Sequence, residues 1–168
     1  KLLQDVIDNN PSLIYALDKE GHFILANQKV ESLFGVANGQ LIGKTRSIAL
    51  PPDIAEQHRN NDLQVIHSRQ AQIFEEENLE ADGKHFYLTH KFPLMNADNQ
   101  VYAVCGTSTD ITERKQGEAA LLESELRFRL LFQNLNSGFA LHEIICDAQG
   151  KPCDYRFLEI NSAFEMLT

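Results

Sequence analysis

Five short stretches of the chain are either continuously apolar or alternate apolar and polar residues with a period of two, which are the patterns of strands with a buried face. Two stretches lie near the start, at residues 13–17 and 23–26, and the other three lie at 72–80, 85–94 and 100–110. Asp-Gly and an Asn-rich segment separate the last three stretches and are typical of tight turns between paired strands. The pattern predicts five antiparallel strands.

Helical spacing marks the segments between and after these strands. Residues 54–68 follow Pro51-Pro52-Asp53 and carry apolar positions at helical intervals, so they predict one longer helix. After Asp110 the chain becomes rich in Glu, Arg and Leu, which predicts another helix over about 112–134. The expected fold is α+β, with short helices and one longer helix on one face of a five-stranded antiparallel sheet, followed by a linker helix.

The beginning of the chain is partly repeated near its end. Each copy has a strand, a Gly-containing turn, a second strand and an Asn that can cap the next helix. The first copy reaches this residue at Asn27 and the second at Asn161. The second copy stops at Thr168, before three further strands could follow, so we expect the truncated start of a second, similar domain.

Composition and charge exclude several classes of protein. Of the 168 residues 43% are hydrophobic and 23% are charged, which is typical of a globular protein. The 24 acidic and 15 basic residues give a net charge of −9, which disfavours contact with nucleic acid or an anionic membrane. The three cysteines form neither a disulfide framework nor a zinc motif, so we expect thiols in a reducing, cytoplasmic compartment. Because the chain begins without Met and stops inside an expected helix, we interpret it as a piece of a longer protein.

Several motifs resemble those of a PAS domain, the sensor module of bacterial signalling proteins such as sensor histidine kinases and diguanylate cyclases. They are Leu25-Ala26-Asn27, Leu33-Phe34-Gly35, Leu41-Ile42-Gly43-Lys44, Asp82-Gly83 and the run from Val104-Cys105-Gly106 through Asp110-Ile111-Thr112 to Lys115. The resemblance implies four segments: an N-terminal helix or cap over 1–10, a PAS domain over 11–112, a signalling linker helix over 113–134 and a truncated second PAS domain over 135–168.

The Asp110-Ile111-Thr112 triplet lies where the last expected strand ends and the linker helix begins. The first turn of a helix leaves backbone N–H groups unpaired, and Oγ1 of Thr112 can accept from one of them, while the carboxylate of Asp110 favours the positive helix end. In PAS domains this corner is also where changes in the sheet reach the output helix. By resemblance, Asp110 and Thr112 are candidates for signal transmission.

Helix and strand geometry select candidate residues for a ligand pocket. His58, Asp62 and Ile66 share the apolar face of the helix at 54–68, where Asp62 can hydrogen-bond His58 four residues away. On the strand at 85–94, alternation groups four side chains on one face, and their apolar members predict that this is the inner face: Phe86, Leu88, His90 and Phe92. The resemblance implies that such residues surround a small ligand.

A haem bound through His58 is an alternative, because haem-containing PAS oxygen sensors are similar in having a His at about this position. The strand at 72–80 has no Arg or Lys to meet the haem, so we prefer a hydrogen-bonded core histidine. A flavin is disfavoured because residues 39–52 hold no cysteine for a photoadduct. Glu75-Glu76-Glu77 is interpreted as a solvated edge or as a partner of Lys44. No catalytic motif appears, and we expect no enzyme activity in this fragment.

Two functions remain open. The chain is either a sensor that binds a small molecule and signals to an output domain beyond it, a histidine kinase or a cyclic-dinucleotide enzyme, or it is a ligand-free dimerisation scaffold. An acid–base site made by His58, Asp62 and His90 is a third and less favoured alternative.

The tail predicts an assembly, because its two strands are too short to form a core of their own. The apolar side chains that need cover are Phe139, Leu141, Ile144, Tyr155, Phe157, Leu158 and Phe164. We therefore expect either a homodimer through the linker helix or the tail, or a tail docked on the first sheet.

Overall fold

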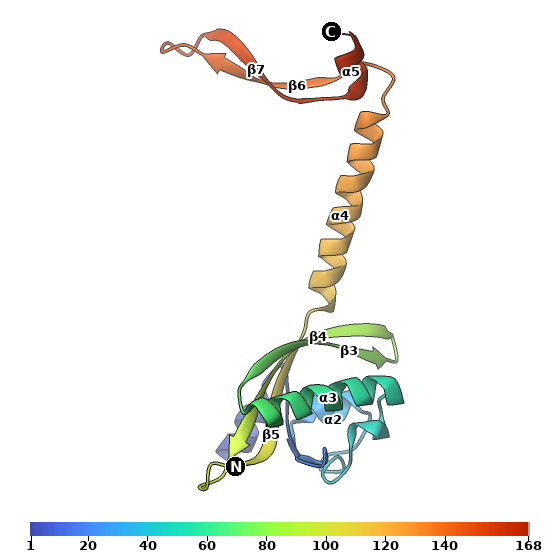
Figure 1. The fold of residues 1–168 in the computed structure, drawn as a ribbon, viewed down its shortest axis with the longest axis vertical. Coiled ribbons are helices and arrows are strands. Elements are labelled where there is room, and N and C mark those ends of the chain that lie inside the picture. Colours follow the sequence, from blue (N-terminus) through green and yellow to red (C-terminus); the bar gives the residue numbers. More distant parts are fainter. Residues whose placement is uncertain (168) are drawn as a thin grey trace. The chain divides into compact units, whose positions relative to one another are not determined.

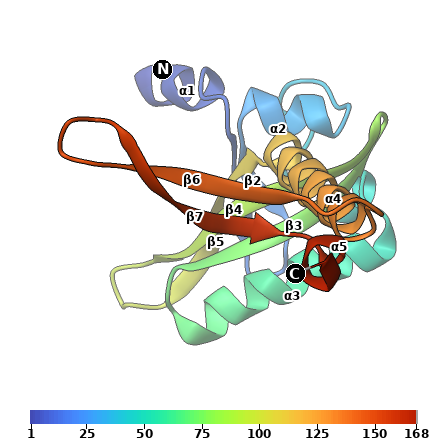
Figure 2. The same ribbon diagram turned by 90° about the horizontal axis from the view of Figure 1, so that it is seen from above.

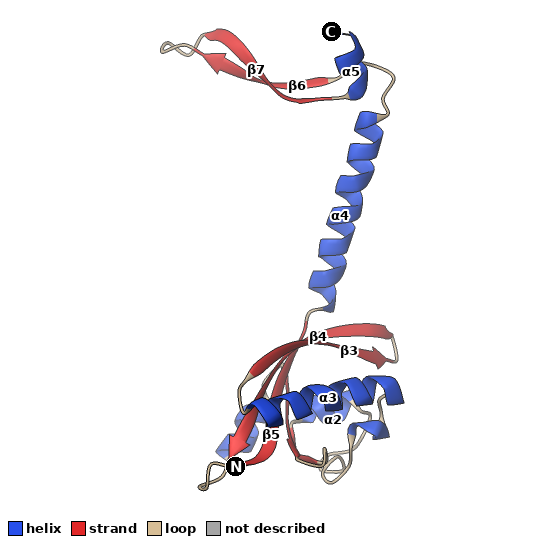
Figure 3. Cartoon of the chain, viewed as in Figure 1, coloured by secondary structure: helices blue, strands red, loops and turns tan. Residues whose placement is uncertain are grey.

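The computed structural model describes residues 1–167 and divides into two compact units, Lys1–Lys115 and the remainder from Gln116. Figure 1 follows the chain through both units, and Figure 3 marks its helices and strands. Thr168, the last residue of the expected second domain, lies outside the described residues.

The first unit is built on a five-stranded sheet with the order β2-β1-β5-β4-β3, and every neighbouring pair is antiparallel. The strands are β1 (Leu13–Asp18), β2 (Phe23–Ala26), β3 (Gln72–Glu80), β4 (Gly83–Met95) and β5 (Val101–Asp110). The β3–β4 hairpin turns at Asp82-Gly83, where Gly83 has a φ of 137° that a side chain would disfavour. The α+β fold and the antiparallel sheet predicted from the sequence are confirmed.

The helices of the first unit are α1 (Leu2–Asp8), α2 (Gln28–Leu33), the short 3₁₀ helix η1 (Arg46–Ile48) and α3 (Pro52–Ser68). Pro52 begins α3, where its missing N–H has no cost, and Arg69 ends it in a left-handed conformation. Figures 1 and 2 show α3 running along the sheet, and it packs against β3, β4 and β5. α3 therefore covers the part of the sheet face that β3, β4 and β5 form.

The apolar core of this unit lies beside β1 and β2. Its buried members are Tyr15, Leu17, Phe23, Val30 and Leu41. The ring of Phe23 meets the rings of Tyr15 and Phe34 edge to face, with centroids 6.1 and 5.8 Å apart. Tyr15 packs so closely on β5 that a Cβ at Gly106 would lie 2.3 Å from its ring, so this strand position requires glycine.

The second unit consists of most of α4 (Thr112–Gln133), the hairpin of β6 (Ala140–Cys146) and β7 (Pro152–Ile160), and α5 (Ser162–Leu167). Phe132 of α4 is buried and meets the ring of Phe139 edge to face at 5.3 Å. The large apolar side chains of the hairpin remain largely exposed: Leu141, Ile144, Ile145, Tyr155, Phe157 and Leu158. None of the described helices is long and apolar enough to cross a membrane.

The repeat predicted from the sequence reappears as two matching sets of hydrogen bonds. Asn27 Oδ1 accepts from the backbone N–H groups of Ile14 (3.1 Å) and Val30 (3.2 Å), and its Nδ2 donates to the carbonyl of Ser12 (2.9 Å). Asn161 repeats this pattern with its own neighbours, accepting at 2.8 and 3.1 Å and donating at 3.0 Å: Phe139, Phe164 and Ser137. In both units, one Asn ties the start of the first strand to the helix after the second.

Candidate ligand cavity and signal exit

A small cavity lies between the sheet and the helices of the first unit. Aromatic and aliphatic side chains form one part of its wall, and polar side chains from α3, η1 and the sheet form the other. The lining includes Tyr15, Arg46, His58, Glu76, Asn78 and Tyr87. Its volume of about 30 Å³ is room for about two water molecules, since one needs roughly 10–15 Å³ on this measure.

Asn78 gives this cavity an unpaired polar group. The residue is 5% exposed, and its Oδ1 is buried with no hydrogen-bond partner among the described residues. A buried carbonyl without a partner costs about 1–3 kcal/mol, and buried polar groups of native proteins are nearly always paired. This atom therefore marks a place where a hydrogen-bond donor is missing.

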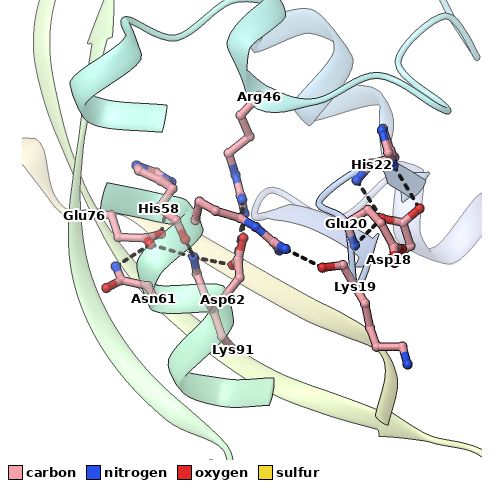
Figure 4. A network of polar contacts seen from close by, with 11 residues as sticks. Asp18, Lys19, Glu20, His22, Arg46, His58, Asn61, Asp62, Glu76 and Lys91 are labelled. Carbon is pink, nitrogen blue, oxygen red and sulfur yellow. Dashed lines mark hydrogen bonds and ion pairs between the residues drawn. The ribbon is translucent and has the colours of Figure 1, made fainter. Parts of the chain in front are cut away.

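A network of charged side chains, drawn in Figure 4, adjoins the cavity through Arg46, His58 and Glu76, which line it. Asp62 of α3 binds the Arg46 guanidinium, and it accepts from Lys91 Nζ at 2.8 Å. Lys91 also donates to Glu76 at 2.7 Å, and Asn61 donates to the same carboxylate at 2.9 Å. Lys91 is completely buried. The positive charges of Arg46 and Lys91 are thus balanced by the negative charges of Asp62 and Glu76 in the interior of the domain.

The pKa values of the acidic members follow from these contacts. Burial would raise the pKa of Asp62, but the charges and hydrogen bonds of Arg46 and Lys91 outweigh it and lower the pKa. For Glu76, too, burial acts to raise the pKa, and the charge and hydrogen bond of Lys91, with the hydrogen bond of Asn61, lower it. Both carboxylates are therefore held in their ionised form.

His58 joins the network as a neutral side chain. Its Nε2 lies 3.2 Å from the carbonyl oxygen of Glu77, and its Nδ1 lies 3.6 Å from the Glu76 carboxylate. Burial is the main cause that lowers the pKa of His58, and the charges of Arg46 and Lys91 act in the same direction. A haem does not fit here, because both ring nitrogens face protein oxygens and the cavity of about 30 Å³ is far smaller than the group.

The exit from the sheet into α4 is fixed by a second set of contacts. Asp110 Oδ1 accepts from the backbone N–H of Thr112 at 2.8 Å, and Thr112 Oγ1 accepts from the backbone N–H of Phe86 at 2.8 Å. The N–H of Ile111 donates to the Phe86 carbonyl at 2.8 Å. The expected bond from Thr112 Oγ1 to its own helix is not among these contacts. Instead Asp110 provides the cap and Thr112 joins the corner to β4.

A model described as the PAS fold matches residues 7–116. The chain belongs to the PAS family. The match covers the whole sheet, the cavity and the exit corner.

Two curated signalling proteins, a histidine kinase and a virulence sensor, contain segments similar to this PAS domain. The methanogenesis regulatory histidine kinase FilI of Methanothrix harundinacea is 23% identical over 141 residues, which are 84% of this chain and 16% of FilI. The virulence sensor protein BvgS of Bordetella pertussis is 26% identical over 121 residues, which are 69% of this chain and 10% of BvgS. The chain therefore spans less than a fifth of the length of these relatives.

Solved structures have a similar fold. The PAS domain from Bordetella pertussis BvgS has a TM-score of 0.58 and 23% identity, and the match covers 75% of this chain and 96% of that one. VqmA bound to DPO has a TM-score of 0.58 and 21% identity, and the match covers 66% of this chain and 57% of that one.

The predicted inner face of β4 is wrong. Phe86, Leu88, His90 and Phe92 point away from α3, and His90 lies exposed in a shallow groove on the outer face of the sheet. The inner face carries Tyr87, Thr89 and Lys91, all of which are buried. Alternation separates the two faces of a strand but does not say which is inner, and here the polar set is inner because it meets the charged network.

Of the three helical candidates, the structure brings His58 and Asp62 to the network, and only His58 lines the cavity. Their expected mutual hydrogen bond is replaced by contacts with Glu76 and Glu77 for His58 and with Arg46 and Lys91 for Asp62. Ile66 lies near the start of β5 instead of at the cavity. The acid–base site predicted from His58, Asp62 and His90 is not formed, because His90 lies on the opposite face of the sheet from His58 and Asp62.

Sequence reasoning missed Arg46, Lys91 and Asn78, and it placed Glu76 on a solvated edge. Glu76 is buried, whereas Glu75 contacts Lys115 and Glu77 contacts Lys84, so the expected Lys44 partnership is not formed by these three carboxylates. A signal was present: Glu76 and Asn78 alternate with their neighbours on β3, as Tyr87, Thr89 and Lys91 do on β4. A polar face on each of two paired strands indicates a buried polar site when both face the same helix.

Proposed function

We propose that this PAS domain is a sensor that binds a small, uncharged molecule in the cavity and passes its state through α4 to an output domain. The observation that carries the proposal is the unpaired Oδ1 of Asn78 at the cavity wall. A ligand with an N–H or O–H group would pair this oxygen, and an apolar remainder would match the rings of Tyr15 and Phe23.

The balance of charge in the network selects for an uncharged ligand. Arg46 and Lys91 offset Asp62 and Glu76, and His58 is neutral, so a charged group brought into the cavity would have no counter-ion. Because the cavity holds only about two waters, a larger ligand would bind a more open form of the domain.

The relatives support a role in signalling. FilI is a regulatory histidine kinase and BvgS is a virulence sensor, and VqmA shows that a protein with this fold was solved bound to a small molecule, DPO. A histidine kinase is therefore our first candidate for the output domain, with a diguanylate cyclase as the other. We place the module in the cytoplasm and the second-copy segment after α4 at the start of another PAS domain.

A thermal-shift screen with paired probes tests the proposal. Small heteroaromatic carboxamides and the matching carboxylic acids differ in charge but little in size. We expect members of the carboxamide set to raise the melting temperature, the acids to leave it unchanged, and Asn78→Leu to respond to neither set. Asn60→Leu, the same change at an exposed position of α3, should respond as the parent does. Equal responses of the parent chain and Asn78→Leu would refute the proposed site.

A ligand-free dimerisation scaffold is the second candidate function. The small volume of the cavity favours it, and so does α4, which exposes a series of large apolar side chains: Leu121, Leu122, Leu126, Phe128, Leu130 and Leu131. Such a surface suits pairing with a second copy of the chain. An absorption spectrum of fresh protein without a chromophore band and no response in the screen, together with a stable dimer in solution, would favour the scaffold.

A further inference from the structure

A cluster of titratable side chains joins the β3–β4 hairpin to the exit corner. His85, the third residue of β4, lies 3.0 Å through Nδ1 from Asp110 Oδ2 and 3.0 Å through Nε2 from Asp82 Oδ1. Glu80 lies 3.9 Å from the same Nδ1. The charged and titratable groups that face His85 are therefore Glu80 from the end of β3, Asp82 from the turn, Asp110 from the end of β5, and Tyr87, stacked on its ring from the same strand.

The two short contacts of His85 need two N–H donors. An ionised carboxylate only accepts hydrogen bonds, and a neutral imidazole carries one N–H, whereas the imidazolium carries one on each nitrogen. A neutral His85 would leave a lone pair facing either Asp82 or Asp110. The observed arrangement is complete only when His85 is protonated.

The carboxylate of Asp110 connects this cluster to the output helix. Its Oδ2 faces His85, while its Oδ1 accepts the Thr112 N–H that begins α4. On the other side, Glu80 accepts from the Tyr87 hydroxyl at 2.6 Å, and Tyr87 lines the cavity. The protonation state of one histidine therefore bears on the first turn of the helix that leaves the domain.

We propose that His85 is a proton-sensitive latch: when protonated it ties the hairpin turn at Asp82 to the helix cap at Asp110, and when neutral it releases one of the two. The latch needs no ligand in the cavity to act on α4. Its hydrogen bond to Asp110 is the main cause that raises the pKa of His85, and Glu80 and Asp82 add to it. The latch is thus closed at and below the ordinary range of histidine, about 6.5, and opens as the pH rises through the raised pKa.

Two measurements on the 168-residue chain test the latch, both in the presence of EDTA. In an NMR titration the His85 ring should have a pKa above that of histidine in an unstructured peptide, and Asp82→Asn should lower it. Amide exchange of Thr112 and Glu113 should lose protection, corrected for the intrinsic pH effect, by about 2- to 10-fold as His85 deprotonates, the range for one hydrogen bond.

A matched histidine provides the control. His22 Nδ1 lies 3.1 Å from Asp18 in the same domain, without a second carboxylate in hydrogen-bond contact and without a contact to α4 among the described residues. His22→Gln should keep the step in protection at Thr112, and His85→Gln should remove it. A pKa of His85 at or below the unstructured value, a flat protection profile in the parent chain, or the same step in His85→Gln would overturn the proposal. If His85→Gln does not fold, Asp82→Asn provides the test. A lower pKa of His85 in this variant, with the loss of Thr112 protection shifted to the same lower pH, supports the latch, and an unchanged pKa and step overturn it.

Discussion

The two units of this chain begin in the same way and end with different interiors. Asn27 and Asn161 make equivalent hydrogen bonds, so the strand, turn, strand and helix start form in both. β1 has a partner on each side, β2 and β5, and its middle residues are buried, whereas β6 pairs with β7 and remains exposed. Local sequence is thus sufficient for the two strands, the turn and the helix start, but a buried interior requires strands that come much later in the first unit.

The largest effect should come from breaking the charged network that only the first unit possesses among the described residues. Asp62→Ala leaves Arg46 and Lys91 buried without their shared partner. Removal of one member of a buried ion pair costs about 3–5 kcal/mol. We expect urea denaturation to show a loss of this size in the unfolding free energy of the first unit. A loss below about 1 kcal/mol would mean that the network does not hold α3 to the sheet.

The equivalent asparagines allow a matched comparison of the two units. Asn27→Ala removes a fully buried side chain with bonds to β1 and α2, which should cost the first unit about 1–3 kcal/mol. Asn161→Ala should leave the unfolding of the first unit within about 0.5 kcal/mol of the parent. Urea denaturation followed by the NMR signals of the five-stranded sheet measures both, and equal losses would contradict the division into two units.

Acid should weaken the first unit through His58, Asp62 and Glu76. The pKa of each is lowered in the folded state, so the stability that each contributes is present above its unfolded value and is lost as the pH falls through its folded value. For His58 the loss begins below about pH 6.5, and for the carboxylates below about pH 4. Because His85 acts in the opposite direction, the test compares variants: His58→Gln should flatten the fall between pH 6.5 and 5. His67→Gln, at an exposed position of α3, should not.

The smallest effect on the first unit should follow removal of residues 134–168. The hairpin contributes no strand to the five-stranded sheet, so the unfolding free energy of the first unit should stay within about 0.5 kcal/mol of the parent. If the exposed side chains of the tail contribute to a dimer, light scattering should show a smaller dimer fraction in the shortened chain. A first unit that no longer folds would contradict the account of two independent interiors.

The sequence was sufficient for the elements and their order because strand alternation, the Asp82-Gly83 turn and the capping asparagines are local signals. The site was harder to predict. Lys91 is buried by partners 15 and 29 residues away along the chain, Glu76 and Asp62, and no local pattern states that these will meet. The prediction for β4 is wrong for the same reason: apolar side chains indicate the inner face, but the inner face of β4 is the one that meets the charged network.

The most direct test of the central claim, that Asn78 serves a ligand, is native mass spectrometry of the freshly purified chain and of Asn78→Leu. The account predicts that the parent chain retains an additional small, uncharged molecule at one per protomer, and that Asn78→Leu carries none while remaining folded. An identical, ligand-free mass for both proteins, with an unchanged fraction of dimer, would contradict the sensor and leave the scaffold.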